Sequence, residues 1–119
     1  MMNGLLIKES LADPSALEWV HITKTESWQA SNTAEYQPVL WTALSFEAAD
    51  HQADTIAEKL SQALKPQGWY INASTVAHVY VIFPNKVFKY RKRDGIQRAE
   101  AKQYGRSIAI PEHQLDWSE

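Results

Sequence analysis

One segment of this chain is restricted to a single conformation by the spacing of its apolar side chains. Between residues 49 and 65 they recur at intervals of one, three or four residues, at Ala49, Ala53, Ile56, Ala57, Leu60, Ala63 and Leu64. This spacing places them on one stripe of an α-helix, with polar side chains on the opposite side. Pro66 and Gly68 end the pattern. We therefore expect a helix over about 49–65 whose apolar face is covered by another layer.

The segments around this helix alternate in polarity and are rich in β-branched and aromatic residues, which is typical of strands. The predicted strands are residues 4–10, 19–26, 39–46, 69–74, 76–83 and 86–91. Pro84 and Asn85 predict a tight turn that joins the last two strands into an antiparallel hairpin. Residues 30–37 are polar and predict a loop.

Two further sites of helix formation are predicted by capping residues. Asp13 and Pro14 indicate a helical turn over 14–18, and Asp94 indicates the start of a second main helix over 95–104, with Gly105 as its C′ residue. The order of the predicted elements along the chain is strands, a helix, more strands and a second helix. This order predicts an α+β fold. We expect a two-layer sandwich in which a mainly antiparallel sheet carries both helices on one face.

Length and composition narrow the class of protein. A chain of 119 residues with 45% apolar side chains predicts one globular domain over residues 1–119. The absence of cysteine excludes disulfides, thiolate catalysis and iron–sulfur clusters. No signal peptide or membrane span is predicted, which favours a cytoplasmic protein without a membrane partner. Walker loops, dinucleotide glycine motifs and zinc ligand sets are absent, so no cofactor is expected.

Charge is unevenly distributed along the chain. Residues 86–106, the basic segment, hold eight of the 12 basic side chains and only two acidic ones, a formal charge of +6. Residues 1–85 hold four basic and nine acidic side chains, and the whole chain has a net charge of −2. Such asymmetry affects association more than it affects the fold.

The basic segment is the first candidate site, for an anionic partner that is either nucleic acid or an acidic protein face. Cations alternate there with aromatic side chains, as in proteins that bind single strands by stacking on bases and contacting phosphates. The residues expected to make the contact are Lys89, Arg91, Lys92, Arg93, Arg98 and Lys102, with Phe88 or Tyr90 stacking if exposed. The alternatives are that the two aromatics pack inward, that the cations protect an edge strand, or that they pair with acids.

A second candidate is a ligand-binding face of the sheet. If the strand faces point the same way, an aromatic and histidine-lined surface would comprise Trp19, His21, Trp41, Asn72, His78 and Tyr80. Such a surface would suit a small molecule or an enzyme's substrate, but also a dimer interface or a core with hydrogen-bonded histidines. The sequence contains no recognisable catalytic pair, so no catalytic residue is assigned and a non-catalytic binding module is favoured over an enzyme.

The acidic side of the first helix is a weaker candidate, as a metal site or as a dimer contact. Asp50, Asp54 and Glu58 recur every four residues, with His51 beside them. No HExxH or EF-hand spacing supports a metal there, and a solvated helix face explains the pattern. Segregated charge also suggests a homo-oligomer in which the basic hairpin of one copy meets the acidic helix of another.

Overall fold

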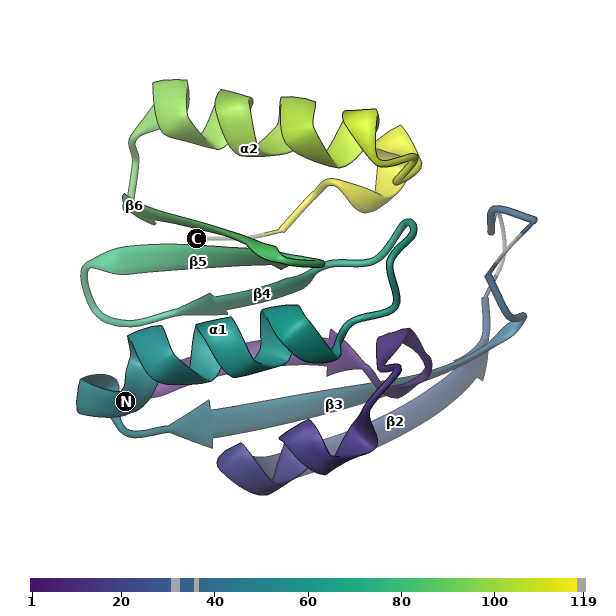
Figure 1. The fold of residues 1–119 in the computed structure, drawn as a ribbon, viewed down its shortest axis with the longest axis horizontal. Coiled ribbons are helices and arrows are strands. Elements are labelled where there is room, and N and C mark those ends of the chain that lie inside the picture. Colours follow the sequence, from purple (N-terminus) through teal and green to yellow (C-terminus); the bar gives the residue numbers. More distant parts are fainter. Residues whose placement is uncertain (31–32, 36, 118–119) are drawn as a thin grey trace.

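The computed structural model describes residues 1–30, 33–35 and 37–117, which form a six-stranded sheet with two main helices (Figure 1). The strands are β1 (Met2–Ile7), β2 (His21–Gln29), β3 (Leu40–Ala48), β4 (Ile71–Ser74), β5 (His78–Phe83) and β6 (Lys86–Arg91). The main helices are α1 (Ala53–Ala63) and α2 (Gly95–Ser107). Short 3-10 helices are η1 (Lys8–Ser10), η2 (Pro14–Trp19), η3 (Asp50–Gln52) and η4 (Glu112–Gln114). The predicted α+β class, the antiparallel sheet and the two main helices are confirmed.

The first strand lies in the middle of the sheet. The strand order is β2-β3-β1-β4-β5-β6, and every neighbouring pair is antiparallel. On one side of β1, Leu6 pairs with Leu44 of β3, and on the other side Leu5 pairs with Asn72 of β4. The β2–β3 pair and the β4–β5–β6 meander are therefore brought together by β1, which pairs with both.

Helix α1 covers one face of the sheet, as its apolar stripe predicts. Its buried side chains include Ile56, Ala57 and Leu60, and they belong to a core cluster with Phe46 and Ile82. The helix turns its polar side toward solvent, and η3 adds one more turn before it. The predicted helix over 49–65 is thus present, with its first turn in 3-10 geometry.

Helix α2 packs against the opposite face, so the expectation that both helices share one face is corrected. Val79, Val81 and Phe83 alternate along β5 with the side chains that contact α1, and they form a second core cluster with Ala101 of α2. Strand β5 is buried on both sides: all of its residues except His78 are buried. Both faces of such a strand are apolar, so its residues do not alternate in polarity. The sequence therefore does not indicate which layer covers each face.

The chain after α2 returns across the same face. In this segment, the tail (residues 108–117), Leu115 and Trp117 are buried in the second cluster, so the tail is anchored to the sheet. Gly105 lies inside α2 and not at the predicted C′ position. A Cβ atom there would lie 2.7 Å from a methyl group of Leu115, so the glycine permits the tail to approach the helix.

The long edge strand starts later than the alternation predicts. Trp19 ends η2, and β2 begins at His21 with a register shift between Ile22 and Lys24. The bulge reverses the alternation at that point, so Trp19 and His21 do not continue the face pattern of the strand. The helical turn after Asp13 is confirmed, since its carboxylate accepts a hydrogen bond from the Ser15 backbone N–H. Of the predicted loop 30–37, residues 31, 32 and 36 lie outside the described residues.

The packing of β1 against its neighbours predicts that Gly4 does not tolerate a side chain. A Cβ atom at Gly4 would overlap the Phe46 ring and lie 2.8 Å from the Ala73 Cβ. Gly4→Ala is expected to lower the free energy of unfolding by about 1–3 kcal/mol because the core must move to admit the methyl group. Gly95→Ala is the matched control, since a Cβ there meets nothing within 4 Å. Urea denaturation of both variants tests the prediction, and equal stabilities would contradict it.

Candidate functional site

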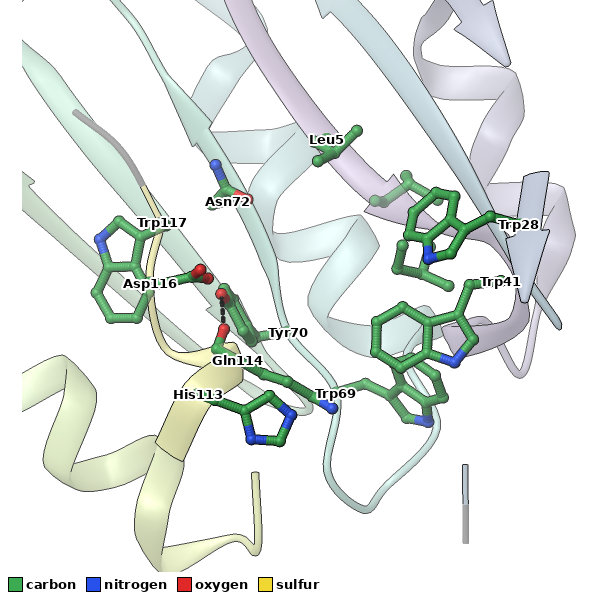
Figure 2. Close-up of a pocket in the computed structure, with 12 residues that line it drawn as sticks. Leu5, Trp28, Trp41, Trp69, Tyr70, Asn72, His113, Gln114, Asp116 and Trp117 are labelled. Carbon is green, nitrogen blue, oxygen red and sulfur yellow. Dashed lines mark hydrogen bonds between the residues drawn. The ribbon is translucent and has the colours of Figure 1, made fainter. Parts of the chain in front are cut away.

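A pocket of about 420 Å³ opens between the tail and the part of the sheet that α2 leaves uncovered (Figure 2). We call it the aromatic pocket. Strands β1 to β4, the segment that precedes β4, and the tail all contribute to it. Its lining residues are Leu5, Leu6, Ile7, Trp28, Trp41, Trp69, Tyr70, Asn72, His113, Gln114, Asp116 and Trp117.

Three indoles form one wall of the aromatic pocket. Trp28 and Trp41 are opposite each other in the β2–β3 register, with ring centroids 6.4 Å apart. Trp69 continues the row at 5.3 Å from Trp41, and both neighbouring ring pairs are tilted by just over 50°. Figure 2 shows the three side chains in a row along one side of the cavity. This wall offers a large apolar surface with π-faces.

The opposite wall is polar and comes mainly from the tail. Asn72 of β4, the Asp116 carboxylate and the Trp117 indole line this side of the cavity (Figure 2). His113 and Gln114 belong to η4 and complete this side. The pocket therefore combines an aromatic wall with an amide, a carboxylate and an imidazole.

Hydrogen bonds fix the side chains that build the pocket. The Trp41 indole N–H donates to the Pro38 carbonyl at 2.8 Å, and the Tyr70 hydroxyl donates to the Gln114 carbonyl. The side-chain amides of Gln37 and Gln114 are hydrogen-bonded at 3.1 Å, which ties the loop before β3 to the tail. The bonds of Gln114 to Tyr70 and to Gln37 join distant parts of the sequence, so the cavity is preformed in the fold.

Burial makes Tyr70 a poor acid. The pKa of its hydroxyl is raised, first by desolvation and then by the nearby negative charge of Asp116. Tyr70 therefore stays neutral across the physiological range and keeps the proton that it donates to Gln114.

The predicted ligand face is divided between the two sides of the sheet. Trp41 and Asn72 do line the aromatic pocket. His78 and Tyr80 face the α1 side, where the Tyr80 hydroxyl donates to Asp54 of α1 at 2.7 Å. His21 is exposed, and Trp19 lies on η2 with the Lys59 ammonium 5.5 Å from its ring centroid. The six residues therefore do not form one surface, because β5 presents His78 and Tyr80 away from the pocket.

The aromatic side chains of the basic segment pack inward. Tyr90 is buried, and its hydroxyl accepts a hydrogen bond from the Trp117 indole N–H at 2.9 Å. Phe88 is half-buried against Phe83 and Tyr104. These rings are expected to stack on bases only if exposed. That condition is not met by the buried Tyr90 and is met only in part by the half-buried Phe88, because α2 and the tail cover the face of β6 that carries them.

Several cations of the basic segment contact groups of the same chain. Lys89 lies 3.1 Å from the Asp54 carboxylate, so the basic hairpin and the acidic helix meet within one chain. Arg98 donates to the Trp117 carbonyl at 2.6 Å and stacks over its ring. Lys102 lies over the same ring. Arg91 and Arg93 are exposed and Lys92 is half-buried, at the end of β6 and the turn that follows it.

Sequence reasoning missed most of the aromatic pocket. It selected Trp41 and Asn72 but not Trp28, Trp69 or Tyr70, nor the tail residues His113, Gln114, Asp116 and Trp117. The only signal for them was the presence of five tryptophans in a chain of this length. Four of the five line the pocket, and Trp19 is the exception.

Comparison with protein-family models, with curated proteins and with solved structures found no match. Within the described residues, no helix is both long and apolar enough to cross a membrane. No group of three or more histidine or acidic side chains in that part of the chain is arranged to hold a metal ion.

The contacts of Asp54 predict a small pH dependence of stability. Hydrogen bonds from Tyr80 and Lys89 lower the pKa of Asp54, so its carboxylate stabilises the fold above its ordinary pKa of 3.8. That contribution is lost as the pH falls through the lowered value. Asp54→Asn is expected to cost less than about 1 kcal/mol at pH 6, since the site is exposed, and progressively less below pH 4.

Urea denaturation between pH 2.5 and 6 measures this effect. Glu58→Gln is a matched control, because it removes an exposed carboxylate from the same helix. A loss of stability in Asp54→Asn that is the same at pH 2.5 and at pH 6 would contradict the assignment.

Proposed function

We propose that the protein is a binding module for a small, flat organic molecule, held in the aromatic pocket. The observation that carries the proposal is the row of three indoles facing an amide and a carboxylate across a cavity of about 420 Å³. Ligand pockets are typically about 300–1,000 Å³ in volume and combine apolar walls with a few polar groups. The proposal concerns binding, and it assigns no catalytic residue.

The lining residues limit the chemistry of the ligand. Trp28 and Trp41 offer π-faces to a planar ring, which favours aromatic or conjugated compounds. Asn72 can donate and accept hydrogen bonds, and the Asp116 carboxylate only accepts them. Lysine and arginine are absent among the described residues that line the pocket. The ligand is therefore a neutral or cationic compound with hydrogen-bond donors, and not a phosphate ester.

Hydrogen bonds that fix the side chains of the pocket support the proposal that it binds a ligand. Trp41 is held by its bond to Pro38, and Tyr70 and Gln114 are held by each other. Asn72, by contrast, has no side-chain hydrogen bond to any described residue, although it lies half-buried in the cavity. A half-buried amide in a fixed cavity is available to a ligand at little reorganisation cost.

Titration with small planar aromatic compounds tests this function through the indole N–H signals of the protein in ¹H–¹⁵N spectra. Binding is expected to shift the signals of Trp28, Trp41, Trp69 and Trp117, and to leave Trp19 unchanged as an internal reference. No shift with any compound of this class, or an equal shift at Trp19, would contradict the proposal.

Two exposed tryptophans provide a matched pair of variants. Trp28 is 42% exposed inside the pocket, and Trp19 is 47% exposed outside it. Trp28→Ala is expected to weaken ligand binding about tenfold because one stacking surface is lost, whereas Trp19→Ala leaves it unchanged. Isothermal titration calorimetry on the two variants measures the difference.

A second candidate function is docking of an anionic partner, nucleic acid or an acidic protein face, on the basic segment. It is favoured by the clustering of Arg91, Lys92 and Arg93 at the end of β6, where the two arginines are exposed. With Phe88 and Tyr90 packed inward, such a surface would contact phosphates or carboxylates by charge alone.

Replacing Arg91, Lys92 and Arg93 with Glu tests this second function. Anisotropy titrations with labelled oligonucleotides at low salt are expected to show binding by the unchanged protein that falls steeply as salt is raised. The triple variant should lose it. A control variant with Lys8, Lys59 and Lys65 changed to Glu has the same net charge and should keep most of it. Equal binding by both variants would exclude this surface.

A further inference from the structure

The outer edge of β2 has no strand paired to it in the described part of the chain (Figure 1). Strand β2 is one of the two longest strands, and seven of its nine residues form a continuous exposed run from Thr23 to Gln29. Such an edge presents a row of backbone N–H and C=O groups, which are a template for pairing with another strand. The side chains along this edge determine which strand can pair with it.

The charges on β2 make the strand complementary to itself. Lys24 and Glu26 lie on the same face, on either side of Thr25, with Lys24 Nζ 2.5 Å from Glu26 Oε1. When two copies of β2 are placed antiparallel about a two-fold axis at Thr25, Lys24 of each copy lies opposite Glu26 of the other. Two cross-strand ion pairs then form on one face, in the arrangement that stabilises antiparallel sheets.

The same charges disfavour the neighbouring registers. An axis at Lys24 would place two lysines opposite each other, and an axis at Glu26 would place two glutamates opposite each other. Like charges in directly opposed positions destabilise a strand pair. The sequence Lys-Thr-Glu therefore selects the register centred on Thr25 among the symmetric pairings nearest to it.

We propose that two copies of this chain associate through β2 in this register and form one continuous antiparallel sheet. An isologous contact of this kind is the commonest way in which identical chains form dimers. The bulge between Ile22 and Lys24 limits the regular segment at one end, so the interface is short and the dimer is weak and concentration-dependent.

The other edge of the sheet, strand β6, differs from β2 in its charge. Strand β6 carries Lys86, Lys89 and Arg91 and no acidic residue, so pairing with itself forms no cross-strand ion pair, and an axis at Lys89 or at Tyr90 places two cations opposite each other. Like-charged side chains are a common protection of edge strands against pairing. Charge thus opposes self-pairing at β6 and favours it at β2.

The proposed dimer does not depend on the proposed ligand, but it has a consequence for the aromatic pocket. A two-fold axis perpendicular to the sheet keeps corresponding faces on the same side. Trp28 lies on β2 and lines the pocket, so the two pockets would open on one side of the joined sheet.

Charge-reversal variants studied by sedimentation velocity over a range of concentrations test the dimer. The unchanged protein is expected to associate, and Lys24→Glu or Glu26→Lys alone should weaken association about tenfold, because two attractive pairs become repulsive. An equimolar mixture of the two variants should restore it as a heterodimer. In that heterodimer the acid introduced at position 24 of one copy faces the base introduced at position 26 of the other. Lys65→Glu is the control for Lys24→Glu, with the same change of net charge away from β2, and it should associate as the unchanged protein does.

Restoration in the mixture is the decisive result, because a change of net charge or a general loss of stability cannot produce it. A monomeric unchanged protein up to millimolar concentration would overturn the proposal. So would unaltered association in the two single variants, or a mixture that associates no better than either variant alone.

Discussion

The docking of Trp117 on the sheet is the interaction on which the candidate site depends. Helix α2 buries only Ala101 and Gly105, so by itself it cannot cover the apolar side of β5. The tail completes the cover with Trp117, whose indole N–H donates to the buried Tyr90 hydroxyl. Burial of large aromatic side chains dominates the energetics of such small cores. The same docking positions Asp116 and η4, so the second core cluster and the polar wall of the aromatic pocket form together.

Two cations of the basic segment contribute to the packing of Trp117. Arg98 and Lys102 both lie over the Trp117 ring, and Arg98 also donates to the Trp117 carbonyl. Each cation–π contact is worth about 0.5–1 kcal/mol at a partly exposed site. Lys89 is drawn to α1 by Asp54 on the other face of the sheet. A run of cations that the sequence presents as one surface is thus divided among two faces and the edge.

The sequence predicted elements well where a single periodicity applied. The apolar stripe around Ile56 and Leu60 places α1, and the Pro84-Asn85 turn places β6 with the bounds observed, Lys86–Arg91. It failed where the two faces of an element are alike or the pattern is interrupted, as in the doubly buried β5 and at the bulge in β2. The pocket could not be predicted from the sequence, because residues of β1, β2, β3 and the tail meet only when β1 lies between β3 and β4 in the sheet.

The aromatic pocket is preformed only if the tail stays docked on the sheet and closes one of its walls. Hydrogen exchange of the five tryptophan indole N–H groups, followed by NMR, tests this docking most directly. The bond to Tyr90 and the burial of Trp117 predict that its indole proton exchanges far more slowly than that of the exposed Trp19. Equally fast exchange at Trp117 and Trp19 would show a tail that leaves the sheet readily, and it would contradict the preformed pocket.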